Sequence, residues 1–173
     1  MVASDPSLFR TERSRESLYR ALTSAELVNA VYVTVEDGYH RVVTRMDENR
    51  RRSELKIPPT ALALWYSSYI DAFSARAHRR RHRVFFDTGP HLVGQYAVEP
   101  TVESRTLPYY KAAKGRGSLT ATDLSINPDT GFPVLSLGFP IVREGAFVGF
   151  AGANITVDVL SYFLDRQATP SSP

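Results

Sequence analysis

Two spacings of apolar residues alternate along the chain and predict its elements. Leu18, Leu22 and Ala25 stand at positions i, i+4 and i+7, which is the spacing of one face of a helix. The first half of the segment 7–29 is almost wholly polar, as expected of a helix that is solvated there or pairs with a partner helix. The pattern therefore predicts a long N-terminal helix over residues 7–29.

After residue 29 the residues become β-branched and aromatic, which is typical of strands. Residues 30–35 and 39–46 flank the tripeptide Glu36-Asp37-Gly38. Glycine tolerates the positive φ that hairpin turns require. These residues therefore predict a β-hairpin directly after the helix.

The rest of the chain divides at glycine, proline and asparagine residues. Further strands are predicted at residues 84–89, 92–98, 118–125, 132–142 and 146–155, with turns at 127–131 and 143–145. Helices are predicted at residues 107–114 and 157–167, and residues 60–75 suit either a helix or an ordered connection. The predicted fold class is α+β, with a central antiparallel sheet of about five strands flanked by helices.

Composition supports one domain and removes several kinds of chemistry. The 173 residues are 43% hydrophobic, enough for a single core. We expect residues 1–29 to pack as a helix on the sheet, residues 30–167 to form the domain, and residues 168–173 to be a linker. The absence of cysteine excludes disulfides, thiolate metal sites and a cysteine nucleophile.

The sequence carries no membrane-spanning signal of its own. No apolar run approaches the roughly 18 residues that a membrane helix needs. The first residues also lack a basic segment followed by an apolar one, which a signal peptide would show. We expect a soluble piece, which can equally be one whose flanking membrane helices are absent.

The net charge of +3 arises from one place in the chain. Residues 76–83 (RAHRRRHR) carry five arginines, and without them the chain would be slightly acidic. A solvated loop or helix face is the ordinary interpretation of such a run, and a docking site for an anionic ligand or a lipid head group is the alternative. Nucleic-acid binding is not expected, because the run lacks interleaved aromatic residues.

Motifs of catalysis and metal binding are missing from the sequence. His78 and His82 stand at i and i+4, a spacing that can ligate a metal on a helix, but the surrounding arginines would repel a cation. No G-x-S-x-G elbow is present, and residues 115–117 lack the rest of a phosphate loop. We therefore expect no metal, no cofactor and no enzymatic activity.

Four segments of the chain carry a family resemblance. Residues 107–113 (LPYYKAA), 130–136 (TGFPVLS), 140–142 (PIV) and 149–155 (GFAGANI) follow one another along the second half. They resemble the short helix, the hairpin and the final strand of the Cache (extracellular PAS-like) family. Residues 31–38 (VYVTVEDG) look like the first hairpin of that family.

The resemblance implies a PAS-like sensor domain outside the cytoplasm, similar to the membrane-distal half of a double Cache module. Such domains belong to bacterial membrane receptors whose output part is a cyclase, a histidine kinase or a chemotaxis module. The implied partners are a small-molecule ligand and the membrane, through helices outside this chain. From the polar first half of the N-terminal helix we also expect a weak homodimer through residues 7–29. The implied location is periplasmic or extracellular.

The resemblance also implies where a ligand would lie. In the amino-acid-binding members a helix arginine grips the carboxylate, and a final-strand aspartate and a strand tyrosine hold the amino group. Those positions fall on Leu107, Asn154 and Ser125 here, and aromatic positions fall on Tyr109 and Tyr110. Lesser candidates are Asp123, Ser136 and Thr122.

Both charge-recognising positions are therefore neutral in this chain. A buried ammonium group needs a paired anion, which Asn154 does not supply. The expected ligand is a small neutral or weakly polar molecule, and no free α-amino acid. Alternatively, Tyr109 and Tyr110 are core residues and Asn154 closes a backbone gap, in which case the domain is a ligand-free dimerisation spacer.

Overall fold

The computed structural model describes residues 9–46, 65–70, 80–87, 91–99, 102–127 and 131–168, and every structural statement below refers to them. The helices are α1 (Glu12–Ser24), α3 (Pro108–Arg116) and α4 (Val157–Ala168), with a 3-10 turn η2 (Ser104–Thr106) before α3. The strands are β1 (Ala30–Val35), β2 (His40–Arg45), β3 (Trp65–Ile70), β4 (Arg81–Phe86), β5 (Leu92–Val98), β6 (Thr120–Ala121), β7 (Ser125–Ile126), β8 (Pro133–Arg143) and β9 (Ala146–Thr156).

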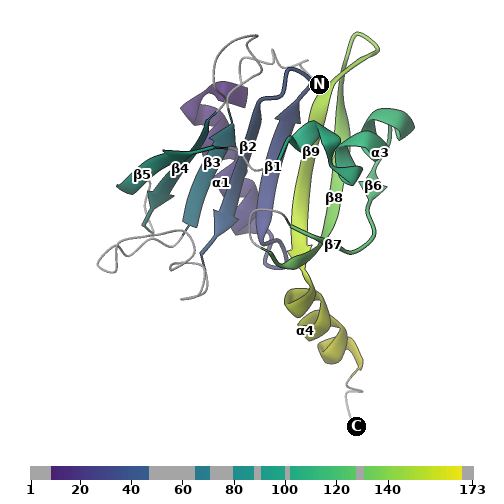
Figure 1. Cartoon of the computed structure of the whole chain (residues 1–173). Coiled ribbons are helices and arrows are strands. Elements are labelled where there is room, and N and C mark those ends of the chain that lie inside the picture. Colours follow the sequence, from purple (N-terminus) through teal and green to yellow (C-terminus); the bar gives the residue numbers. More distant parts are fainter. Residues whose placement is uncertain are drawn as a thin grey trace.

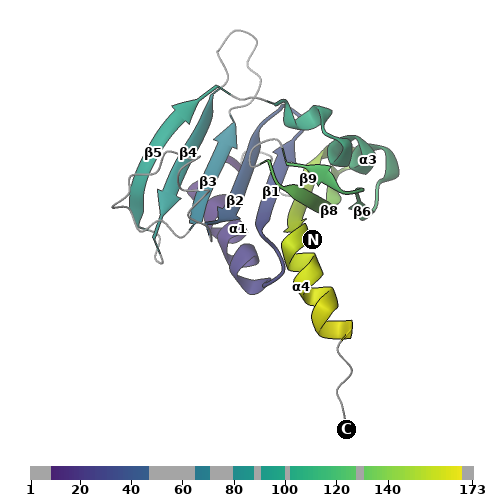
Figure 2. The ribbon, with the colours of Figure 1, turned by 60° about the horizontal axis from the view of Figure 1, so that its bottom comes forward.

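The strands form one antiparallel sheet in the order β5-β4-β3-β2-β1-β9-β8-β6, and β7 also pairs with β8. Helix α1 covers one face of the sheet, whereas α3 lies on the other face (Figures 1 and 2). Helix α4 leaves the end of β9 and extends beyond the sheet. The predicted α+β, PAS-like class is confirmed, and the described part of the chain contains nine strands where about five were expected.

The first hairpin forms where its turn residues predict it. Gly38 has a φ of 91°, in the left-handed region that glycine enters without strain. The Asp37 carboxylate accepts a hydrogen bond from the backbone N–H of Tyr39 at 2.9 Å, which fixes the turn. All six residues of β1 are buried, because β1 lies in the middle of the sheet.

The last hairpin joins the two longest strands. Glu144 and Gly145 both have positive φ values, 50° and 81°, as a two-residue hairpin turn of the primed type requires. The pairing shifts register between Ile141 and Val142, which marks a bulge. Strand β9 then pairs with β1 on its other side, so it lies inside the sheet.

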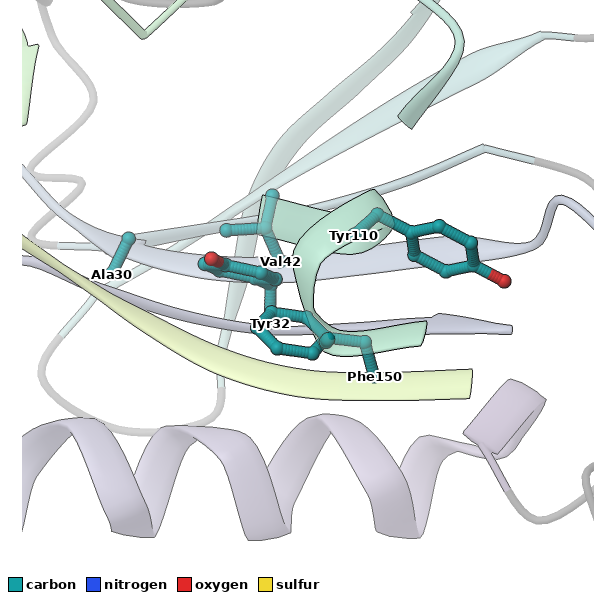
Figure 3. Packing of buried hydrophobic residues seen from close by; sticks show 6 residues of the cluster. Ala30, Tyr32, Val42, Tyr110 and Phe150 are labelled. Carbon is teal, nitrogen blue, oxygen red and sulfur yellow. The ribbon is translucent and has the colours of Figure 1, made fainter. Parts of the chain in front are cut away.

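The alternation of side chains along the strands creates two separate cores. On the α1 face, Leu22 packs with Val31, Val43 and Phe86. On the α3 face, Tyr32, Val42 and Phe150 are among the buried residues that pack against Tyr110 and Ala113 of α3. Figure 3 shows Tyr32, Val42 and Phe150 on the side of the strands that faces away from α1.

Helix α1 is shorter than the sequence predicts. It begins after Thr11, whose side-chain oxygen accepts a hydrogen bond from the N–H of Ser14 at 3.3 Å. It ends at Ser24, where the Arg45 guanidinium donates to the backbone oxygens of Leu22 and Ala25 at 2.6 and 3.0 Å. Part of the predicted helix, residues 7–8, lies outside the described residues.

Two further segments differ from expectation. The described part of residues 60–75 is β3, a strand between β2 and β4 and not a helix. Residues 118–125 form only the short β6 and the first residue of β7, because the chain leaves the sheet between them. Strands β3, β4 and β5 extend the sheet on one side, which explains its greater width.

Within the described residues, no helix combines the length and the apolar character needed to cross a membrane.

Candidate functional site

A pocket of about 90 Å³ lies on the α3 face of the sheet. Residues of β1, β2, β4, β7, β8 and β9 line it together with the start of α3. Polar and apolar side chains both contribute, as in sites that orient a small ligand. The pocket has three parts: an aromatic wall, a polar end near β9 and a basic end near β4.

The aromatic wall consists of Tyr32, Tyr109 and the neighbouring Phe150. The ring centroids of Tyr32 and Tyr109 are 5.1 Å apart, and those of Tyr109 and Phe150 are 5.4 Å apart. Such distances are within the range of favourable aromatic contacts. The wall therefore holds Tyr109, which is the second residue of α3, against the centre of the sheet.

Two glycines make room for this wall. Gly138 and Gly152 pair with each other across β8 and β9. A Cβ atom on Gly152 would lie 2.6 Å from the Phe150 ring and 2.7 Å from the Tyr32 ring. The aromatic side chains therefore occupy space that any other residue would fill.

The polar end of the pocket is centred on Asn154. Its side-chain Oδ1 accepts a hydrogen bond from the Ser136 hydroxyl at 2.9 Å. Its backbone oxygen accepts one from the N–H of Asn29, also at 2.9 Å. Because Oδ1 and the backbone oxygen are engaged, the NH₂ group with its two N–H donors is the part of Asn154 that a ligand can use.

The Tyr32 hydroxyl adds a further polar group to the lining. Tyr32 is 2% exposed, and its hydroxyl makes no hydrogen bond of normal geometry in the described part of the chain. Burial raises its pKa well above the usual value, the neighbouring Tyr109 adds to the rise and Ser136 opposes it. A buried hydroxyl without a partner is costly, so a ligand oxygen there would stabilise the fold.

The basic end of the pocket contains His40 and Arg81. His40 Nδ1 lies 2.8 Å from the Thr34 hydroxyl, and Arg81 is 3% exposed. Burial raises the pKa of Tyr109, whereas a hydrogen bond with Thr34 and the positive charge of Arg81 lower it. The guanidinium of Arg81 therefore acts on the same region of the pocket as Tyr109.

Most of the residues that the sequence singled out lie around this pocket. Tyr109, Asn154, Ser125, Ser136 and Leu107 all belong to its lining. They come from α3, β7, β8 and β9, and the sheet register places Ser136 directly opposite Asn154.

Tyr110, Asp123 and Thr122 are not part of the lining. Tyr110 donates a hydrogen bond of 2.6 Å to the Glu36 carboxylate, and its ring meets Phe147 edge-on. Burial and the negative charge of Glu36 raise the pKa of Tyr110. Asp123 is exposed, and Thr122 bonds to the backbone of Ser136. Tyr110 therefore fits the alternative interpretation given above, in which it is a core aromatic residue whose hydroxyl has a hydrogen-bond partner.

Sequence reasoning missed Tyr32, His40 and Arg81. The alternation of β1 and β2 would have placed Tyr32 and His40 on the face of Ala30 once the register was known. Arg81 was counted with the basic run, for which a solvated face was expected, but residues 81–83 belong to β4. Arg80 is exposed as expected, and residues 76–79, which include His78, lie outside the described residues.

Metal binding finds no support in the described ranges, since they contain no group of three or more histidine, aspartate or glutamate side chains that could hold an ion.

Comparisons with known proteins identify the fold. No family model matches the sequence, and no curated protein matches it. Among solved structures, the sensory domain of the Campylobacter jejuni chemoreceptor Tlp3 superposes with a TM-score of 0.54 at 12% identity, over 98% of this chain and 52% of that one. The same receptor's ligand-binding domain in complex with 4-methylisoleucine gives 0.52 at 12% identity, over 96% and 48%.

The extracellular domain of the putative histidine kinase soHK1S-Z6 is also similar, with a TM-score of 0.53 at 8% identity, over 95% of this chain and 50% of that one. The chain thus spans about half the length of these structures. It has the fold of Cache-type extracellular sensor domains, as the sequence motifs predicted.

Proposed function

We propose that this chain is the ligand-binding part of a bacterial signal-transduction receptor and lies outside the cytoplasm. The observation that carries the proposal is the pocket between α3 and the sheet, lined by residues of β9 and α3. The fold shared with chemoreceptor and histidine-kinase sensor domains supports it. The domain itself performs no chemistry in this proposal, because its role is to change conformation when a small molecule binds.

The ligand would be held by the lining groups described above. Asn154, Ser136 and Ser125 offer hydrogen bonds at one end, and Tyr109 and Leu107 cover the pocket from the start of α3. A free α-amino acid does not fit this arrangement, because the neutral side chain of Asn154 cannot compensate the positive charge of the amino acid's ammonium group. We therefore expect the common amino acids not to bind with micromolar affinity.

A signal would leave the pocket through β9. Asn154 is two residues before the end of that strand, and α4 begins at Val157 directly after Thr156. A ligand that contacts Asn154 thus lies close to an element that can shift as a rigid body. It biases this helix only by its differential affinity for the two arrangements.

The alternative function is a ligand-free dimerisation spacer with the same fold. In a spacer the pocket would be filled and its polar groups satisfied by the protein itself. The free volume favours the sensor, as does the Tyr32 hydroxyl, for which the described residues supply no hydrogen bond of normal geometry.

Thermal stability in the presence of a metabolite library separates the two functions. A ligand at 100 times its dissociation constant stabilises the folded state by about 2.7 kcal/mol, which raises the melting temperature measurably. Hydrogen exchange with the ligand so found should show increased protection at Tyr109 and Asn154 and a change from Thr156 to Leu164. Protection that changes at the pocket and stays flat across α4 would mean that the domain captures a ligand without signalling through that helix.

A further inference from the structure

We propose that Arg81 forms an anion subsite at the β4 end of the pocket, and that the ligand is a small carboxylate without an ammonium group. This inference rests on the proposed function and names the class of ligand for that site. It revises the expectation of a neutral ligand, which considered Leu107 and Asn154 but placed Arg81 on a solvated surface.

The position of Arg81 carries the first part of the argument. Arg81 is the first residue of β4, is 3% exposed, and lines the pocket with His40. The pairing of β2 with β3 and of β3 with β4 sets Arg81 in one cross-strand row with His40. A guanidinium is seldom buried this fully, so its burial at a pocket calls for a role.

The subsite is separate from the polar end at Asn154. Asn154 pairs with Ala30, which pairs with Thr44, whereas Arg81 belongs to the row of His40. Thr44 and His40 are four residues apart on β2, which corresponds to about 13 Å along the strand. Arg81 therefore marks one end of the pocket, where the carboxylate would bind, and Asn154 lies at the opposite end.

Guanidinium chemistry selects a carboxylate. Arginine has five N–H donors in a planar fork, so it can keep a partner within the protein and still donate to ligand oxygens. Carboxylate oxygens accept such charge-assisted bonds in pairs. The Tyr32 and Tyr109 hydroxyls lie along the same pocket and can donate as well.

The rest of the lining limits what else the ligand carries. A volume of about 90 Å³ beside aromatic rings suits a short apolar chain attached to the carboxylate. An added ammonium group would be buried beside Asn154 or in the field of Arg81, and neither compensates it.

Calorimetry with matched pairs of compounds tests the subsite on the unmodified chain. The probes are linear carboxylates from acetate to hexanoate, the corresponding primary amides, and norvaline as the amino-acid counterpart of pentanoate. At constant chloride concentration, we expect the best carboxylate to bind at least about tenfold more tightly than its amide and than norvaline.

Variants assign the preference to one residue. Arg81→Gln should reduce carboxylate affinity by about tenfold or more and leave amide affinity unchanged, and Arg81→Lys should retain only part of the affinity. The matched control is Arg80→Gln, because Arg80 precedes Arg81 and is exposed. If Arg81→Gln does not fold, the comparison of carboxylates with amides on the unmodified chain decides.

Equal binding of amides and carboxylates, or a preference that survives in Arg81→Gln, would overturn the subsite. The same holds if no carboxylate binds at millimolar concentration. A different hit from the metabolite library would then leave the sensor function standing, whereas the absence of any hit would remove both proposals.

Discussion

At the scale of single residues, the aromatic wall depends on two glycines, Gly138 and Gly152, which leave room for the rings because they carry no Cβ atom. Gly152 lies between the Tyr32 and Phe150 rings, which occupy the space of its absent Cβ. The Tyr32 and Phe150 rings in turn support Tyr109, so the geometry of the pocket and the stability of the sheet both depend on the packing of these rings.

Gly152→Ala should destabilise the domain by about 1–3 kcal/mol, because the added methyl group forces two packed rings to move. Chemical denaturation measures the loss. Gly94→Ala is the matched control, since Gly94 also lies in a strand and a Cβ there meets nothing within 4 Å. Equal losses in the two variants would show that strand conformation, and not the wall, sets the cost.

Glu36 links the first hairpin to α3, and its interactions should make the stability of the fold depend on pH. Its carboxylate accepts hydrogen bonds from Tyr110 and Lys114. Burial opposes ionisation, but these two partners lower the pKa of Glu36 below its ordinary value of 4.5. The contribution to stability is therefore complete above pH 4.5 and is lost as the pH falls through the lowered pKa.

Glu36→Gln should make the free energy of unfolding less dependent on pH below 4.5 than it is in the unmodified chain. Denaturation curves at a series of acidic pH values measure the slope. Glu144→Gln, which removes an exposed carboxylate, should keep the original slope. An unchanged slope in Glu36→Gln would contradict the assigned interactions.

Single residues also show where the sequence could predict the site and where it could not. Asn154 was predicted because a motif position of the family falls on it, whereas Ser136 was only a lesser candidate until the register placed it opposite Asn154. Arg81 was missed because its burial depends on β3, β4 and β5 joining the sheet beside β2. That pairing joins strands that are distant in the sequence, and a run of arginines does not indicate it.

At the scale of elements, local signals placed both hairpins and the helices, although α1 is shorter than predicted. Turn residues marked the first hairpin and the last one, and helical spacing marked α1 and α4. Residues 60–75 were expected to form a helix or an ordered connection, and their described part, residues 65–70, is a strand. Cross-strand partners on β2 and β4 decide the matter, and a sequence taken alone does not show them.

Helix α1 is the element for which we predict self-association. Its outer face is exposed and charged, with Arg13, Glu16 and Arg20 along it. Sedimentation velocity should show a weak, concentration-dependent dimer that salt dissociates further. The double variant Arg13→Glu and Arg20→Glu should weaken the dimer, and Arg143→Glu, on an exposed residue of β8, should not. A chain that stays monomeric at all concentrations would remove α1 as the interface.

At the scale of the whole molecule, one sheet separates two independent cores. Helix α1 closes the first core, and α3 with the pocket closes the second. The α3 face thus combines packing with the pocket described above. This division places the polar groups of the pocket where movement of α3 leaves the other core intact.

The position of β9 has a mechanical consequence. This strand is hydrogen-bonded to β1 on one side and to β8 on the other, and α4 continues from its end without a break. Backbone hydrogen bonds of antiparallel strands run perpendicular to the strand direction. Tension applied through α4 along β9 would therefore load both ladders in shear, with many bonds sharing the force, so the sheet would resist extraction of the strand while α4 itself unwinds first.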